Sequence, residues 1–131
     1  MTKFSPATAA LILERDGGRC FWCGRYVLHG TRGRDYSIHH RCPRGAGGSK
    51  APWIGTAANG LTLCGTGTEG CHGEFESDRN RARALGVLVS ALAAFSRVEN
   101  RPENVPVEDR HGRLWQLTID GRKLPATPTP L

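Results

Sequence analysis

The sequence contains no long hydrophobic run, and this absence limits the classes of protein to which it can belong. A helix that spans a bilayer needs about 20 apolar residues, whereas the longest apolar stretch, residues 85–95, is much shorter and includes Gly86 and Ser90. The amino-terminal segment also lacks a secretory pattern, because the charged residues 14–16 end its apolar run. We therefore expect a cytoplasmic protein, in the host cytoplasm if a phage encodes it, with no membrane contact.

Apolar residues as a whole are scarce. They make up 38% of the 131 residues, while glycine (17) and proline (8) are plentiful. A chain of this length forms one modest hydrophobic core, and the composition predicts a compact centre with much loop. We expect an interaction other than hydrophobic burial to help hold the fold together.

Acidic side chains are outnumbered by basic ones. The chain has 18 Lys and Arg against 12 Asp and Glu, which gives a formal net charge of +6 and an isoelectric point of about 9.5. This excess favours a polyanionic partner, of which nucleic acid is the commonest. A basic surface with no partner explains the same charge, so the charge alone leaves both interpretations open.

The five cysteines cannot all form disulfides with one another, and four of them show metal-ligand spacing. Cys20 and Cys23 are separated by two residues, and Cys64 and Cys71 by six. A Cys-x2-Cys turn directs two thiolates at one tetrahedral ion, and a second pair completes a four-sulfur zinc site. Buried thiols or a redox motif are the alternatives, although no βαβ pattern surrounds the first pair. Cys42 is expected to pack or to lie free.

Short elements of both kinds are predicted, which makes the chain an α+β protein. Ser5 and Pro6 form a helix start, with serine as N-cap and proline at the first helical position, and Gly17-Gly18 is typical of a helix end. Helices are predicted at residues 7–15 and 73–85, strands at residues 26–28, 36–40 and 61–64, and a loop at residues 41–59.

The last third of the chain has weaker patterns. We predict a strand and a short helix within residues 87–98, and a strand over residues 113–120 that ends in an Asp-Gly turn. The expected organisation is one domain with the zinc site over residues 1–90, an extension packed on it over residues 91–123, and a disordered tail over residues 124–131.

The histidines form a second constellation, interleaved with the cysteines. His39 and His40 are adjacent at the end of a predicted strand, and Asn59 and His72 follow later. Phosphodiester hydrolysis needs a base that deprotonates water and a cation that stabilises the reacting phosphate. Neighbours on a regular strand point to opposite faces, so two consecutive histidines serve one site only near a strand end. A surface histidine pair, with His72 as a further zinc-site residue, is the alternative.

Several of these stretches occur together in a specific combination. They are Cys20-Phe-Trp-Cys23-Gly24, Ser37-Ile-His-His-Arg-Cys-Pro-Arg-Gly45, Gly47-Gly48, Asn59, and Leu63-Cys64 to Cys71-His72. Over roughly residues 5–90 the sequence thereby resembles the HNH endonucleases, especially small ones of bacteriophage genomes.

The resemblance implies a small ββα-metal core, in which a two-stranded antiparallel hairpin and a helix grip one divalent ion. A structural zinc knuckle, flanking helices and a short carboxy-terminal β extension would complete the fold. The resemblance implies that His39 and His72 are metal ligands, that His40 is the general base, and that Asn59 pins the loop that orients it. Glu76 matches a third ligand, although it also suits the first turn of a helix as a residue that complements the helix dipole.

Two positions depart from the family pattern. His39 stands where many members carry aspartate, and its softer nitrogen makes Mn²⁺, Ni²⁺ or Zn²⁺ as suitable as Mg²⁺ for the catalytic ion. Gly60 separates Asn59 from Leu61, where members usually have leucine directly after the asparagine. The expected cofactors are therefore one structural Zn²⁺ and one catalytic divalent ion.

The resulting functional hypothesis is a DNA endonuclease that nicks or cuts, used in phage DNA processing or packaging with terminase or other packaging proteins as partners. Arg41, Arg44 and Lys50 are the candidates for phosphate contacts. One alternative is a non-catalytic, zinc-stabilised DNA-binding module, which has no use for the histidines. The other is a packaging accessory protein, whose partner contacts would lie after residue 90.

Overall fold

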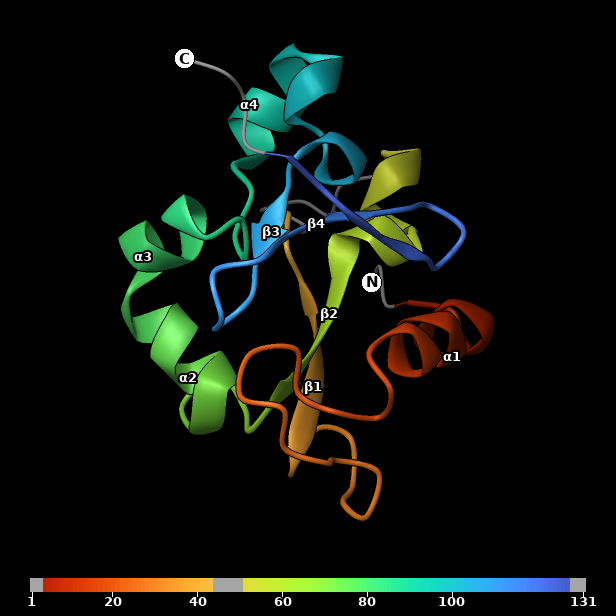
Figure 1. The fold of residues 1–131 in the computed structure, drawn as a ribbon, viewed down its shortest axis with the longest axis vertical. Coiled ribbons are helices and arrows are strands. Elements are labelled where there is room, and N and C mark those ends of the chain that lie inside the picture. Colours follow the sequence, from red (N-terminus) through yellow and green to blue (C-terminus); the bar gives the residue numbers. More distant parts are fainter. Residues whose placement is uncertain (1–3, 44–50, 128–131) are drawn as a thin grey trace.

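The computed structural model describes residues 4–43 and 51–127, and within these residues the chain forms a small α+β fold (Figure 1). Its α-helices are α1 (Pro6–Arg15), α2 (Gly70–Ser77), α3 (Arg79–Ala84) and α4 (Ala91–Ser96). Its strands are β1 (Tyr36–His40), β2 (Gly60–Cys64), β3 (Val107–Glu108), β4 (Leu114–Leu117) and β5 (Lys123–Pro125). The predicted α+β class is confirmed. None of the helices described is long and apolar enough to cross a membrane.

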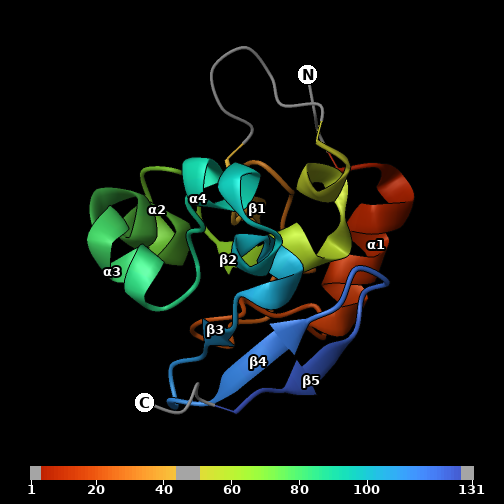
Figure 2. The same ribbon diagram turned by 90° about the horizontal axis from the view of Figure 1, so that it is seen from above.

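The two-stranded sheet of β1 and β2 lies at the centre of the molecule. The strands are antiparallel, in a register that pairs Tyr36 with Cys64 and His40 with Gly60. Both views place α1 on one side of this strand pair and α2 with α3 on the other (Figures 1 and 2). The strand predictions at residues 36–40 and 61–64 are confirmed. The only difference is that β2 starts one residue earlier than predicted.

Helix α1 forms as predicted and is fixed to β2 by a buried ion pair. Ser5 Oγ accepts a hydrogen bond from the backbone N–H of Thr8 at 3.1 Å and so caps the helix. At the other end, Arg15 Nε lies 2.9 Å from Asp16 Oδ1, and both side chains are almost completely buried. Arg15 also donates to the carbonyl of Gly60, and Asp16 accepts from the backbone of Thr62. The pair therefore sets where α1 meets the first half of β2.

Gly60 permits a close approach at the same place. It lies opposite His40, and a Cβ added to it would collide with the Ile12 side chain and press on the Phe4 ring. Because Gly60 has no side chain, Phe4 can pack close to the strand pair at this position. This close packing accounts for the glycine that follows Asn59 in the sequence.

Three sequence predictions for residues 26–85 differ from the structure. Residues 26–28 form no strand and contribute only an isolated bridge between Arg19 and Tyr26. The helix predicted over residues 73–85 starts earlier, at Gly70, and is broken at Asp78, whose side chain caps α3. In the predicted loop, residues 52–55 and 57–59 form two short 3-10 helices.

The carboxy-terminal part forms the second sheet, in the order β3-β4-β5. The predicted strand over residues 113–120 is confirmed in its first half as β4, and the chain turns at Gly121. The strand predicted near residue 87 is not formed, whereas the short helix after it is α4. The disordered tail predicted from residue 124 is wrong at its start, because Leu124 pairs with Gln116 in β5. Residues 128–131 lie outside the described part of the chain.

The second sheet packs on the same core as the central strands. Val107 and Leu117 are fully buried in one cluster with Ile12, Leu61 and Leu63. A second, smaller hydrophobic cluster is formed by Cys42, Trp53, Ile54, Val89 and Ala94. Residues after 90 are therefore an integral part of the hydrophobic core.

Among the residues that the structure describes, Arg41 has the largest fully buried side chain, which corrects its predicted role as a phosphate contact. Its guanidinium donates hydrogen bonds of 2.6–3.0 Å to four backbone carbonyls, those of Ala58, Gly86, Pro102 and Val105. A side chain in this position cannot reach a DNA backbone. The other two predicted phosphate contacts, Arg44 and Lys50, lie outside the residues that the structure describes.

We expect Arg41→Met to lower the free energy of unfolding by roughly 3 kcal/mol or more, because each buried carbonyl left without a donor costs about 1–3 kcal/mol. Chemical denaturation followed by circular dichroism measures the difference. Arg113→Met, at an exposed position directly before β4, is the matched control and should be nearly neutral. Equal stability of the two variants would show that the guanidinium contacts contribute little.

Candidate functional site

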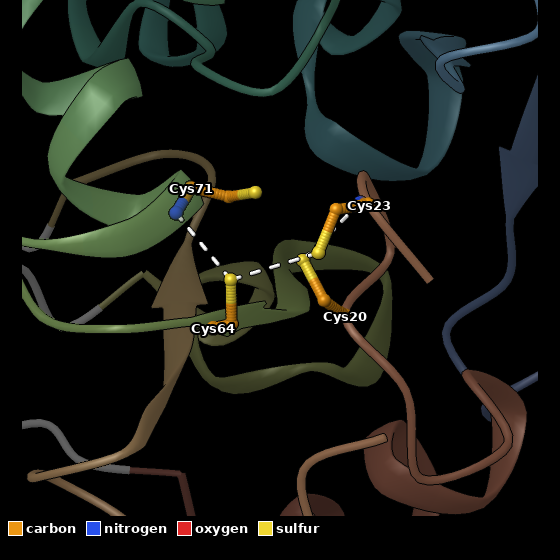
Figure 3. A group of neighbouring side chains, drawn as sticks. All are labelled: Cys20, Cys23, Cys64 and Cys71. Atoms are coloured by element: carbon orange, nitrogen blue, oxygen red, sulfur yellow. Dashed lines mark hydrogen bonds between the residues drawn. The ribbon is translucent and has the colours of Figure 1, made fainter. Parts of the chain in front are cut away.

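The four paired cysteines converge on one point. Cys20 and Cys23 lie in the turn after α1, Cys64 ends β2, and Cys71 lies in the first turn of α2 (Figure 3). Their sulfur atoms all lie within 4.8 Å of one another, and Cys23 Sγ is 3.7 Å from Cys64 Sγ. The predicted cluster is therefore formed, and its donor set suits a structural Zn²⁺.

Backbone amides and burial act in opposite directions on the cysteine thiols. The N–H of Cys23 points at Cys20 Sγ and the N–H of Cys71 at Cys64 Sγ, each at 3.5 Å. These amide donors stabilise negative charge on sulfur. Burial raises the pKa of the Cys20 thiol to about 11, so this thiol stays protonated near neutral pH unless a cation displaces the proton.

The wide spacing of the second cysteine pair is explained by a tight turn. Gly65 and Gly70 both have positive φ, +83° and +65°, and the N–H of Thr66 donates to the carbonyl of Glu69. The six intervening residues thus fold back on themselves. The turn brings Cys71 back to Cys64 as a two-residue spacer would do.

A second candidate metal site is formed by His39, His72 and Glu76. His39 lies on β1, and the other two lie one turn apart on α2. One ligand atom from each residue can be chosen so that all three lie within 4.8 Å of one another. Glu76 Oε1 lies 3.6 Å from His72 Nε2, while its Oε2 accepts from Arg79 at 3.0 Å. Because α2 starts at Gly70, Glu76 lies beyond the first helical turn, and the dipole interpretation does not apply.

Burial favours the neutral form of both histidines of this group. Burial, reinforced by the neighbouring His72, lowers the pKa of His39 to about 3. Burial also lowers the pKa of His72, which Glu76 partly opposes. A neutral imidazole keeps a lone pair on one ring nitrogen, which is the form that binds a metal.

His40 borders the same cleft. Its ring stacks on Phe4, with centroids 4.0 Å apart and planes inclined by 11°. The cleft has a volume of about 500 Å³ and is lined by Ile38, His39, His40, Pro43, His72, Glu76, Arg79 and Leu88. Two consecutive histidines reach one cleft because β1 ends at His40.

Asn59 holds the chain immediately after His40. Its side-chain oxygen accepts from the N–H of Cys42 at 2.7 Å, and its amide nitrogen donates to the carbonyls of Cys42 and Ile54. The backbone carbonyl of Asn59 accepts from the N–H of Arg41. The fully buried Asn59 therefore fixes the two residues that follow His40. Cys42 belongs to neither candidate metal site and packs, as one of the two predicted alternatives had it.

Three residues of the site were missed at the level of sequence. Ser37 lies two positions before His39, and strand alternation alone would have placed both on one face. Phe4 precedes the N-cap of α1, a position at which apolar residues often pack. Arg79 follows Glu76 by three residues, which is the spacing of a helical ion pair.

Comparison with known protein families, curated proteins and solved structures finds no match for this chain. The roles of the site residues therefore depend on the geometry described above.

We expect purified wild-type protein to carry one tightly bound zinc ion per chain, and Cys64→Ser to lose it together with most of its thermal stability. A four-thiolate site contributes to folding directly, because the site does not exist in the unfolded chain. Zinc content by atomic emission and the melting temperature are the measurements. Cys42→Ala is the control and should retain the ion. Equal zinc contents in the two variants would contradict the assignment.

Proposed function

We propose that the protein is a metal-dependent DNA endonuclease that hydrolyses phosphodiester bonds in the cleft between β1 and α2. The observation that carries this proposal is the convergence of a candidate metal site and a separate histidine in one cleft. Hydrolysis of a phosphodiester needs these two functions side by side.

In this proposal His40 is the general base. It takes a proton from a water molecule whose oxygen attacks phosphorus, and the bond from phosphorus to the 3′ oxygen breaks. The products carry a 5′-phosphate and a 3′-hydroxyl, the latter completed by a proton from solvent. A divalent ion held by His39, His72 and Glu76 would supply positive charge to the phosphate and the leaving oxygen.

The surroundings of His40 support its role as a base. The Phe4 ring fixes the plane of the imidazole, and the amide of Asn59 holds the backbone that follows it. A base must lie within hydrogen-bond reach of its water in a defined orientation to contribute about 10²–10⁴-fold to the rate. These two contacts restrict the motion of the His40 side chain. Free motion of this side chain would weaken its contribution to the rate.

Because Arg41 is buried, Arg79 takes its place in this proposal as the residue that contacts phosphate. This residue lines the cleft, and its side chain is 46% exposed while one nitrogen is paired with Glu76. The remaining guanidinium donors suit a phosphate oxygen. Arg25 and Arg34 are also exposed, but they line a different pocket, in which Arg34 is paired with Asp35.

A packaging accessory protein is the second candidate function, and one observation favours it. Leu92, Phe95 and Val98 are 79%, 57% and 55% exposed on and after α4. Apolar side chains grouped in this way often mark contacts with another protein. Such a contact is compatible with nuclease activity that depends on a phage terminase or another packaging protein.

Protein that retains its structural zinc is expected to nick or linearise supercoiled plasmid when Mg²⁺, Mn²⁺, Ni²⁺ or Zn²⁺ is added. His40→Ala should lower the cleavage rate by about 10²–10⁴-fold, and His111→Ala, in an exposed turn, should have no effect. Gel electrophoresis of time points gives the rates. Equal cleavage by all three proteins would mean a contaminating nuclease or a wrong assignment of His40 as the base. Retained DNA binding without cleavage under any metal would favour a non-catalytic binding module.

Arg79→Ala should weaken DNA binding roughly uniformly across sequences and reduce the salt dependence of the affinity by about one unit of slope, as expected for one lost phosphate contact. Fluorescence anisotropy at several salt concentrations measures this change. Arg83→Ala on the same helix removes the same charge away from the residues that line the cleft. An identical change in both variants would mean that Arg79 acts only through net charge.

A further inference from the structure

We propose that Ser37 is a positioning residue, which fixes His72 as the tautomer with its hydrogen on Nδ1 and so presents Nε2 to the metal. This inference rests on the proposed function, since it concerns the ligands of the same site. Nothing in the sequence motifs assigns a role to this serine.

The direction of the hydrogen bonds determines the tautomer. Ser37 Oγ lies 2.8 Å from the carbonyl oxygen of Gly65 and 3.0 Å from His72 Nδ1. A carbonyl oxygen only accepts, so the single hydroxyl hydrogen of Ser37 is donated to Gly65. The serine oxygen can then only accept from the ring, and His72 Nδ1 must carry the hydrogen.

The remaining ring nitrogen points to the candidate metal site. Nε2 of His72 lies 3.6 Å from Glu76 Oε1, which belongs to the same ligand group. With the hydrogen on Nδ1, the lone pair of Nε2 is directed at the position between these residues.

His39 is fixed in the opposite tautomer by a similar contact. Its Nε2 lies 2.9 Å from the carbonyl oxygen of Val87, so Nε2 carries the hydrogen and Nδ1 is left with the lone pair. The two imidazoles therefore offer different nitrogen atoms to one ion. Partners of this kind orient metal ligands and raise their basicity, and their loss costs about 10–100-fold in metal affinity.

The acceptor of the Ser37 hydrogen belongs to the turn between Cys64 and Cys71. Gly65 adopts a positive φ of 83°, and a Cβ there would collide with the backbone of Glu69. The closed turn thus holds the carbonyl towards Ser37. The contact links the cysteine cluster to the second site through one hydroxyl group.

The test is nitrogen-15 NMR of the histidine rings at pH 7.5, on protein that retains its structural zinc and has no metal in the second site. We expect the His72 hydrogen on Nδ1 and the His39 hydrogen on Nε2. In Ser37→Ala, His72 should shift towards the Nε2–H form, which neutral histidine favours in water, while His39 is unchanged. The Ni²⁺ dissociation constant by calorimetry should rise by about 10–100-fold.

Ser37→Thr keeps the hydroxyl group and suits a strand, so it should restore both the tautomer and the Ni²⁺ affinity. Zinc content and melting temperature confirm that the variants are folded. A wild-type His72 with its hydrogen on Nε2, or a Ser37→Ala variant with unchanged tautomer and affinity, would overturn the proposal. Neither measurement involves DNA, so the two proposals can fail separately. If the tautomer and the Ni²⁺ affinity depend on Ser37 but the protein cleaves no plasmid, the role of Ser37 is supported and only the nuclease proposal is refuted.

Discussion

The hydrogen bonds of the Arg41 guanidinium are the interaction on which the arrangement of the chain around the cleft depends. The four carbonyls that it binds belong to the 3-10 helix before β2, to the end of the α2–α3 segment, and to residues 102 and 105. Arginine offers five donors in a rigid plane, so one side chain can satisfy acceptors from three separate stretches. Because Arg41 directly follows His40, the candidate base is attached to the point where these stretches meet, and the carboxy-terminal part of the chain supports the site.

The register of β1 against β2 determines how the two candidate metal sites share the fold. Pairing Tyr36 with Cys64 places the cysteine turn at one end of the strand pair, and α2 begins where that turn ends, at Gly70. Successive helical residues are rotated by about 100°, so Cys71 and His72 can point to different sites from one turn of α2. A metal in the cysteine cluster would therefore orient the helix that carries two of the candidate ligands of the second site.

Local patterns predicted those parts of the structure that are determined by neighbouring residues. The cap at Ser5, the strands on both sides of the loop and the spacing of the cysteines are all of this kind. The role of Arg41 was missed because its acceptors come from positions as distant as 102 and 105, which no local pattern connects to a loop arginine. The break at Asp78 was missed because its side chain caps α3 in competition with a continuous helix, and both outcomes fit the same apolar pattern.

The two adjacent histidines differ in environment, and this difference suits them to different tasks. His39 is buried, donates to a carbonyl and has a lowered pKa, which favours the unprotonated form that a metal ligand needs. His40 is half-buried at the strand end, where its ring stacks on Phe4 and borders the cleft. Two imidazole nitrogens and one carboxylate favour a later transition metal more than a set of oxygen ligands does. A histidine at position 39 would thus extend the range of ions beyond Mg²⁺ without altering the role proposed for its neighbour.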